Sequence, residues 1–212
     1  MKVLVAGAHG DTGQILVRIL AEQPEHEVHA MVRDYDQAGI MREWGADYIV
    51  TADLENNVSK APKEMDAVLF AAGSGPEADL EKILAVEQVG AKKLIDASRA
   101  QGVHQFIMLS SIGADQPSGP DKYYLEAKGT ADAHLQSSGL THTIIRTGSL
   151  TPGEGTGLVE IKERFTDAYE RSISREDAAA VMIASLTHNK ARDKTFELSS
   201  GDRSVNEALN KL

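Results

Sequence analysis

The sequence contains no cysteine among its 212 residues. This absence excludes disulfide bonds, thiolate nucleophiles and zinc–thiolate sites together. Long hydrophobic runs are also missing, because no apolar stretch approaches the roughly 20 residues that a membrane span requires. The apolar stretch within "MKVLVAGAHG" is too short, and too soon followed by glycine, for a signal peptide. We therefore expect a soluble, cytoplasmic protein without a membrane partner.

Positive charge is scarce: 22 lysine and arginine residues face 32 aspartate and glutamate residues, for a net charge of −10 at pH 7. This balance disfavours nucleic acid as a partner, because binding to the phosphate backbone relies on clustered lysine and arginine. An anionic ligand would need a local positive site. The hydrophobic content of 42% and the charged content of 25% are those of an ordinary globular protein.

Short apolar runs alternate with amphipathic stretches along the whole chain. This alternation predicts an α/β fold, a doubly wound, Rossmann-like parallel sheet with helices on both faces. We expect one domain over residues 1–212, in which residues 147–212 form a small C-terminal part on the substrate side. The expected strands are 2–7, 27–33, 46–50, 66–73, 104–111, 141–147 and "TFELS", and the expected helices are 11–23, 36–44, 79–100, 122–138, 175–187 and a terminal helix.

Three evenly spaced glycines, Gly7, Gly10 and Gly13, follow the first strand and open the first helix. In this context Gly7 permits a tight turn, Gly10 lets the backbone approach a pyrophosphate, and Gly13 allows close packing of helix and strand. The helix N-terminus offers unpaired N–H groups to phosphate, with Asp11 or Thr12 as the expected helix cap. A dinucleotide site is the favoured interpretation, and a purely structural turn is the alternative.

The end of the second strand bears on the choice of cofactor. An acidic residue about 20 positions beyond the glycines usually binds the ribose 2′-hydroxyl of NAD, but that position here is Arg33. A guanidinium there could pair with the 2′-phosphate of NADP. Asp34 and Asp36 would oppose such a dianion, and a solvated surface arginine is the alternative. We expect NADP(H), with NAD less favoured.

Tyr124 and Lys128 lie one helical turn apart, so both project from one face of the predicted helix. An ammonium beside a phenol lowers the phenol's pKa and eases proton transfer. The preceding strand ends in Ser110 and Ser111. Because ligands bind beyond the carboxyl ends of parallel strands, we expect these four side chains at one crevice. The alternative is a structural role, in which each serine caps the next element.

These motifs resemble the short-chain dehydrogenase/reductase superfamily over essentially the full length, in particular its small atypical members of the YhfK-like epimerase/reductase group. The matching segments are "GAHGDTGQ", "AMVRD", "VLFAAGSG", "FIMLSSIGA", "YYLEAKGTAD", "GLTHTIIRTGSL", "SISREDAAAVMIASL" and "KTFELSSGD". The resemblance implies NADP bound along the strand ends and three catalytic residues. Ser111 would orient a substrate oxygen, Tyr124 would donate or accept a proton, and Lys128 would hold the nicotinamide ribose.

The expected cofactor-binding residues combine the motif positions with His9, a second donor to the adenosine end, and Asp53, which is either an adenine contact or a helix cap. The full set is Gly7, His9, Gly10, Asp11, Thr12, Gly13, Arg33, Asp53, Leu54, Ala71, Ala72, Gly73, Ser110 and Lys128. No metal site is expected, because the histidines are scattered.

Two positions depart from the superfamily pattern. Glu87 stands where an asparagine belongs to the usual proton relay, and "Arg-Thr-Gly" at 146–148 replaces Arg-Pro-Gly. Arg146 could face an acidic substrate or form a structural ion pair. The leading hypothesis is an NADP(H)-dependent reductase of a small carbonyl or conjugated substrate, acting as a monomer or weak homo-oligomer. The alternatives are an epimerase or isomerase that retains its cofactor, and a catalytically silent redox sensor similar to the NmrA-like regulators.

Overall fold

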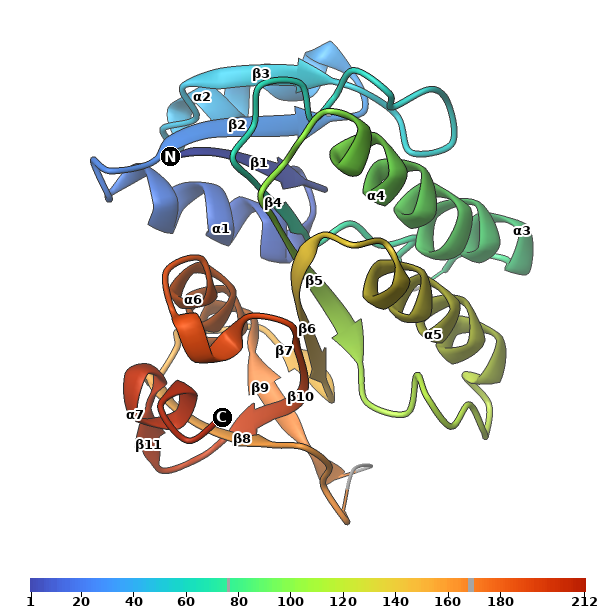
Figure 1. The fold of residues 1–212 in the computed structure, drawn as a ribbon, viewed down its shortest axis with the longest axis vertical. Coiled ribbons are helices and arrows are strands. Elements are labelled where there is room, and N and C mark those ends of the chain that lie inside the picture. Colours follow the sequence, from blue (N-terminus) through green and yellow to red (C-terminus); the bar gives the residue numbers. More distant parts are fainter. Residues whose placement is uncertain (76, 168–169) are drawn as a thin grey trace.

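Nine strands of the described chain form one central sheet, in a computed structural model that describes residues 1–75, 77–167 and 170–212 (Figure 1). The strand order is β11-β8-β10-β6-β5-β4-β1-β2-β3, and the strands from β3 to β10 run parallel. The antiparallel edge consists of β8 and β11. The bounds are β1 Lys2–Ala6, β2 Glu27–Val32, β3 Tyr48–Thr51, β4 Ala67–Phe70, β5 Gln105–Ser111, β6 Thr141–Thr147, β8 Leu158–Lys162, β10 Lys194–Ser200 and β11 Arg203–Ser204.

Helices cover both faces of this sheet because successive strand residues point to opposite sides. Val3 and Val5 of β1 pack with α1 and α6, whereas Leu4 packs with α4 and α5. Figure 1 shows these two helix pairs on opposite sides of the sheet. The α-helices are α1 Asp11–Ala21, α2 Ala38–Glu43, α3 Leu80–Ile83, α4 Ala91–Ala100, α5 Lys122–Ser137, α6 Arg175–Ser185 and α7 Val205–Leu209. The chain also forms the 3-10 turns η1 Tyr35–Gln37 and η4 Asn189–Ala191 and the π-helical segment η2 Leu84–Gly90.

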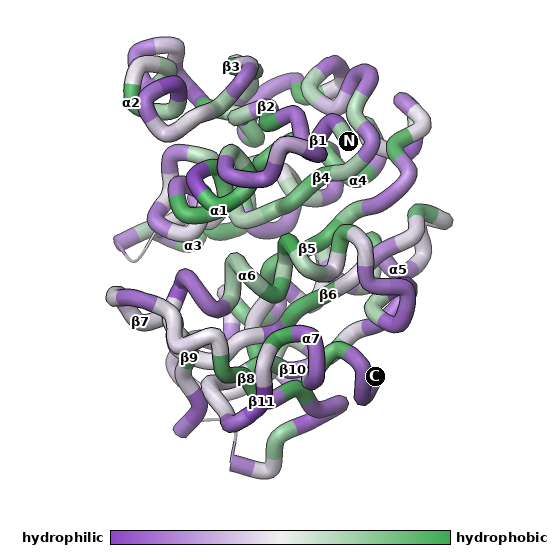
Figure 2. The backbone as a smooth tube through the Cα atoms, turned by 90° about the vertical axis from the view of Figure 1, so that its left-hand side faces the viewer, coloured by the Kyte–Doolittle hydropathy of each residue, from purple (hydrophilic) through white to green (hydrophobic). Residues whose placement is uncertain are grey.

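The doubly wound α/β architecture expected from the sequence is confirmed, and every predicted parallel strand is present. Hydrophobic residues follow β4, β5 and β6 through the middle of the molecule in Figure 2, while the outer turns are largely hydrophilic. Continuous apolar strands of this kind are typical of a parallel sheet buried on both faces. None of the helices in the described ranges is long and apolar enough to cross a membrane.

The C-terminal part contains short strands that the sequence did not predict. Strand β7 (Ser149–Thr151) pairs with β9 (Ser172–Ser174) in a small second sheet, and β8 and β11 extend the edge of the main sheet. The Asp177 carboxylate also accepts the backbone N–H groups of Thr156 (3.0 Å) and Gly157 (2.7 Å). These short strands form by long-range pairing, which local sequence patterns do not reveal.

Two predicted helices differ in detail. The helix expected over 79–100 contains a π-helical turn, η2, between α3 and α4. The expected side-chain cap of the first helix is wrong, because Gly10 occupies the cap position and makes no side-chain hydrogen bond, while Asp11 already lies inside the helix. The N-terminus of α1 therefore has no side-chain cap at its cap position, which suits an anion-binding turn.

Candidate functional site

The turn after β1 brings two backbone segments into close approach. Gly7 has a positive φ of 82°, and a Cβ there would lie 2.5 Å from the backbone of Ala72. A Cβ on Gly13 would lie 2.0 Å from the carbonyl oxygen of Gly7. At Gly10 the nearest atom would be 3.3 Å away. Gly7 and Gly13 are therefore required by the geometry of the turn, and Gly10 is the most tolerant of the three.

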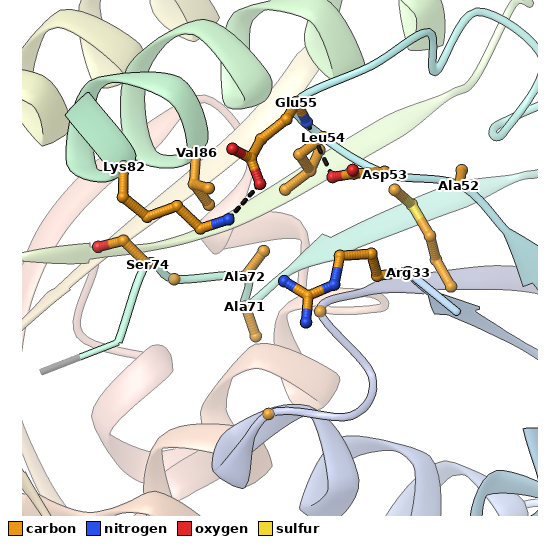
Figure 3. Close-up of a pocket in the computed structure, with 14 residues that line it drawn as sticks. Arg33, Ala52, Asp53, Leu54, Glu55, Ala71, Ala72, Ser74, Lys82 and Val86 are labelled. Atoms are coloured by element: carbon orange, nitrogen blue, oxygen red, sulfur yellow. Dashed lines mark hydrogen bonds and ion pairs between the residues drawn. The ribbon is translucent and has the colours of Figure 1, made fainter. Parts of the chain in front are cut away.

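A pocket opens above this turn at the carboxyl ends of β1, β2, β3 and β4 (Figure 3). It lies at the point where the strand order reverses between β1 and β4, which is where ligands bind in open parallel sheets. The floor of the pocket is the glycine turn. Because these glycines carry no Cβ, a phosphate group could lie close to the protein backbone there. The pocket is lined by Gly7, Gly10, Met31, Arg33, Ala52, Asp53, Leu54, Glu55, Ala71, Ala72, Gly73, Ser74, Lys82 and Val86.

Arg33 supplies a positive charge to this pocket. Its side chain is 56% exposed, and its Nε lies 3.3 Å from Oδ2 of Asp34. Figure 3 shows the guanidinium reaching into the pocket toward Ala71, with the ion pair of Lys82 and Glu55 on the other side. An exposed pair of this kind is weak, so the guanidinium can exchange its partner for an anionic ligand.

Asp53 lies in the pocket wall but is engaged in a turn. Its carboxylate accepts the backbone N–H of Glu55 (3.0 Å) and the side-chain amide of Asn56 (2.8 Å). The chain continues as a turn at this point, so the helix-cap alternative for Asp53 is wrong. Asp53 and Leu54 line the pocket, and the adenine contact stays a prediction.

Several predicted cofactor residues lie outside the pocket lining. His9 is exposed, and its carbonyl accepts a hydrogen bond from Gln14 (2.7 Å). Asp11 forms an ion pair with Arg175 (3.2 Å) on α6. Thr12 and Gly13 are buried within α1. These residues shape the turn, and the geometry of the described chain does not aim their side chains into this pocket.

Lys128 lies in a buried cluster beside the pocket. Its Nζ is 3.0 Å from Oε2 of Glu87 and 3.1 Å from the carbonyl oxygen of Leu109 at the end of β5. The other oxygen of Glu87 accepts the backbone N–H (2.8 Å) and hydroxyl (3.0 Å) of Ser74, which lines the pocket. Burial alone would lower the pKa of Lys128, but the Glu87 carboxylate outweighs it and raises that pKa above its ordinary value.

Tyr124 does not have the lowered pKa that we expected. The Lys128 Nζ lies 5.8 Å from the centre of its ring, on the same face of α5. Burial raises the pKa of Tyr124, and although Lys128 opposes this, Glu87 and nearby aspartates reinforce it, so the net shift is upward. The prediction considered the ammonium without the burial of the phenol, which is the largest influence on its pKa. The phenol is therefore protonated at neutral pH.

The two serines at the end of β5 have different surroundings. Ser110 is buried, and its hydroxyl donates to Oδ2 of Asp132 (3.0 Å), so it faces the interior of the fold. Ser111 is half-buried, with a long hydrogen bond of 3.4 Å to the carbonyl of Ile112. A bond of that length is weak. Of the two hydroxyls, that of Ser111 is the more readily diverted to a ligand.

Arg146 forms structural ion pairs, which is one of the two roles that the sequence left open for it. Its guanidinium lies 3.0 Å from Asp132 and 3.2 Å from Asp115, and Asp115 also pairs with Arg164. Burial raises the pKa of Asp132, with Arg146 and Ser110 opposing it. Among the described residues, Oδ1 of Asp132 has no hydrogen-bond partner. This network fixes the ends of β5 and β6 beneath the Tyr124–Lys128 face.

Comparisons with known proteins agree with this geometry. Residues 7–189 match the sequence model of a family described as NAD(P)H-binding, which spans the glycine turn and every pocket-lining residue. The chain belongs to the NAD(P)H-binding family. The family description indicates a nicotinamide nucleotide as the cofactor.

Relatives of this NAD(P)H-binding chain match it over its whole length. The "Uncharacterized sugar epimerase YhfK" of Bacillus subtilis is 39% identical over 218 residues, covering all of both chains. A solved structure from Bacillus halodurans, assigned to the NAD-dependent epimerase/dehydratases, has a TM-score of 0.94, 41% identity and full coverage of both chains. The oxidoreductase ylbE from Lactococcus lactis has a TM-score of 0.86 and 29% identity, covering 100% of this chain and 96% of its own.

Sequence reasoning missed part of the lining of the pocket at the ends of β1, β2, β3 and β4. The unanticipated lining residues are Met31, Ala52, Glu55, Ser74, Lys82 and Val86. Ala52, Glu55 and Ser74 are next to predicted residues and could have been found by extending each motif by one position. Lys82 and Val86 reach the pocket from the helix after β4, and no local pattern marks a residue that arrives by tertiary packing.

Proposed function

We propose that the protein is an NADP(H)-dependent oxidoreductase that reduces a small carbonyl or conjugated substrate. The observation that carries this proposal is a pocket above a glycine turn, whose lining residue Ser74 is hydrogen-bonded to Glu87, which pairs with Lys128. The Lys128 Nζ in turn lies 5.8 Å from the centre of the Tyr124 ring. When bound, the reduced nicotinamide would supply a hydride from its C4. The Arg33 guanidinium, exposed in the pocket, would bind the 2′-phosphate that distinguishes NADP from NAD.

Tyr124 would serve as the proton donor to the substrate oxygen. Its pKa is raised by burial, so the phenol carries the proton that carbonyl reduction consumes. Ser111 would orient the same oxygen by exchanging its weak hydrogen bond to Ile112 for one to the substrate. Lys128 already has two acceptors, Glu87 and Leu109; because an ammonium has three N–H donors, a ribose hydroxyl could take the third.

Residues 147–212 would form the substrate side of this single-domain enzyme. Strands β7 and β9 and the loop held by Asp177 belong to this part. The Asp177 clamp and the β7–β9 pairing would give the substrate a fixed wall. A cytoplasmic, monomeric or weakly oligomeric enzyme with small-molecule ligands is part of the same proposal.

An epimerase that retains its cofactor is the second candidate. It is favoured by the name of the 39% identical relative from Bacillus subtilis, a sugar epimerase. Such an enzyme would keep its nicotinamide through purification, because each turnover regenerates the starting redox state. A reductase would exchange its cofactor freely. Absorbance of the purified protein near the nicotinamide band separates these two candidates.

The reductase proposal is tested by following NADPH oxidation across a panel of small aldehydes, ketones and enones. Tyr124→Phe removes only the phenolic hydroxyl, and we expect turnover to fall about 100-fold or more, as is typical for loss of a general acid. Tyr123→Phe is the matched control, because the neighbouring Tyr123 is 60% exposed and should leave turnover unchanged. Unchanged turnover in Tyr124→Phe would exclude the proposed role.

A further inference from the structure

Lys82 is a second cation in the wall of the pocket that contains Arg33. It lies on α3, where the Asp79 carboxylate accepts its backbone N–H (2.8 Å) and caps the helix. Its ammonium forms an ion pair with Glu55, which follows β3 in the chain. Figure 3 shows these two side chains meeting across the pocket from the Arg33 guanidinium. The ion pair therefore joins two walls of the pocket.

The backbone on each side of this ion pair is held independently of it. Asp53 accepts the backbone N–H of Glu55 (3.0 Å), and the Lys93 ammonium donates to the carbonyl of Asn56 (2.7 Å). Lys82 belongs to α3, which continues through η2 into α4. The side chains of Lys82 and Glu55 are 33% and 35% exposed, so solvent weakens their attraction. They can separate without moving the backbone that carries them.

Charge is balanced in the described lining of the pocket. The cations Arg33 and Lys82 are matched there by the carboxylates of Asp53 and Glu55. The phosphates of a nicotinamide nucleotide are anionic, so this balance leaves no net attraction for them. Asp53 accepts N–H groups of its own turn, whereas Glu55 is paired with a cation. Displacement of Glu55 would therefore leave a lysine ammonium for a phosphate.

The ion pair also limits the room in the pocket. The free volume of the pocket is about 180 Å³, whereas sites for small organic ligands start at roughly 300 Å³. Lys82 and Glu55 are long, partly exposed side chains in its lining. Their separation would widen the pocket without a change in the sheet or in the glycine turn. A nucleotide that displaces Glu55 thus gains both space and a cation.

We propose that Lys82 binds a phosphate group of the cofactor, and that Glu55 occupies Lys82 until the cofactor displaces it. The inference rests on the proposed function for its ligand, a nicotinamide nucleotide in this pocket. It deepens that function by adding a cation and a competing carboxylate to the cofactor site. An ammonium pairs with phosphate as well as with carboxylate, so the exchange replaces one ion pair by another. The displaced carboxylate turns to solvent, to which it is already partly exposed.

The test is calorimetric titration of NADPH and NADH into charge variants of the pair, which needs no activity. Lys82→Met keeps the length of the side chain and removes its charge, and we expect affinity to fall about 10-fold or more. Glu55→Gln keeps the size of the side chain and removes the competitor, and we expect affinity to rise about 2- to 5-fold. Lys82→Arg keeps the charge and should retain most of the affinity.

The two nucleotides identify which phosphate Lys82 binds. Both carry the pyrophosphate, and only NADPH carries the 2′-phosphate that we assign to Arg33. Equal fold losses for NADPH and NADH in Lys82→Met would support a contact to the pyrophosphate. A loss confined to NADPH would support a contact to the 2′-phosphate.

Lys122→Met and Glu126→Gln are the matched controls. These residues form an ion pair (3.5 Å) on the exposed side of α5, and neither is among the described residues that line this pocket. The two variants change the net charge by the same amounts and should leave both affinities unchanged. An ion pair that only holds the walls together would make Lys82→Met and Glu55→Gln both bind more weakly. That result, or unchanged affinity in either variant, would overturn the inference.

Failure of the proposed function gives a different result. If Lys82→Met and Glu55→Gln shift nucleotide affinity in opposite directions while Tyr124→Phe turns over as fast as the wild type, the reductase proposal fails and the assignment of the ion pair stands. If Tyr124→Phe loses turnover while Lys82→Met binds both nucleotides like the wild type, only the present inference fails.

Discussion

Two cations, Arg33 and Lys128, lie at opposite ends of the proposed cofactor site and have contrasting environments. The Arg33 side chain is 56% exposed and has a neighbouring carboxylate at 3.3 Å, in a pocket that is open to solvent. The Lys128 side chain is 7% exposed, with Glu87 at 3.0 Å and the Leu109 carbonyl at 3.1 Å. The first cation is open to a ligand, and the second already has two acceptors within the protein.

The two environments suit the two roles in the proposed function. Arg33 would bind the anionic cofactor, and Lys128 lies beside Tyr124, the proposed proton donor. Exposed ion pairs contribute about 0–1 kcal/mol, so Arg33 loses little when it turns from Asp34 to a phosphate. A buried pair behaves differently, because removing one partner leaves an uncompensated charge in the interior. Arg33 can therefore pair with a ligand, whereas the charge of Lys128 is balanced by Glu87 inside the protein.

The largest effect on the cofactor end is expected from Gly13→Ala. The new Cβ would lie 2.0 Å from the Gly7 carbonyl oxygen, so the turn must shift away from its phosphate-binding geometry. Overpacking against backbone costs about 1–3 kcal/mol or more, and we expect NADPH to bind about 100-fold more weakly. Isothermal titration calorimetry measures this affinity. Gly39→Ala, where a Cβ would meet nothing within 4 Å, is the control and should bind normally.

The next effect concerns the tyrosine end and is a loss of stability. Glu87→Ala leaves Lys128 buried without its counter-charge, and we expect the free energy of unfolding to fall by about 3–5 kcal/mol at pH 7. Urea denaturation followed by circular dichroism measures it. Glu126→Ala removes a half-exposed partner of Lys122, 3.5 Å away on the same helix, and should change stability by about 0.5 kcal/mol or less. Equal losses of stability in the two variants would contradict the difference between a buried and an exposed ion pair.

The stability lost in Glu87→Ala should depend on pH in a defined way. The pKa of Glu87 is lowered on folding, so its contribution is present above its ordinary value of 4.5 and is lost as the pH falls through the folded-state value. The pKa of Lys128 is raised, so its contribution is present below 10.5 and is lost as the pH rises through its folded-state value. In Glu87→Ala, burial without the carboxylate lowers the pKa of Lys128. The difference in stability between wild type and Glu87→Ala should therefore shrink at acidic pH, where Glu87 is protonated, and also at alkaline pH, where the variant's Lys128 loses its proton.

The sequence predicted the cofactor end better than the tyrosine end. The glycine turn and Arg33 lie on consecutive elements, so counting along the chain was enough to place them. The tyrosine end depends on Glu87, which reaches Lys128 from a different helix through a π-helical turn. The family resemblance showed that Glu87 departs from the usual asparagine, but not which group it pairs with. The expected lowering of the Tyr124 pKa by Lys128 is outweighed by burial first, with Glu87 adding to it.

Other parts of the chain also depend on long-range contacts that the local sequence does not predict. The parallel strands were predicted because each carries its own apolar run, whereas β8 and β11 form by pairing at the edge of the sheet. Ser110 was expected in the crevice, and its burial against Asp132 follows from the packing of α5 on β5. Each of these outcomes depends on contacts between residues far apart in the sequence.

The most direct test compares NADPH and NADH binding to the wild type and to Arg33→Ala. The wild type should bind NADPH more tightly, because the 2′-phosphate meets the guanidinium. A charge-assisted hydrogen bond of about 1.5–3 kcal/mol predicts that Arg33→Ala loses about 10-fold or more in NADPH affinity and keeps its NADH affinity. Arg42→Ala, which removes an exposed arginine that packs on Tyr35 instead, should change neither. Equal affinity of the wild type for both cofactors, or equal losses in Arg33→Ala, would contradict the account.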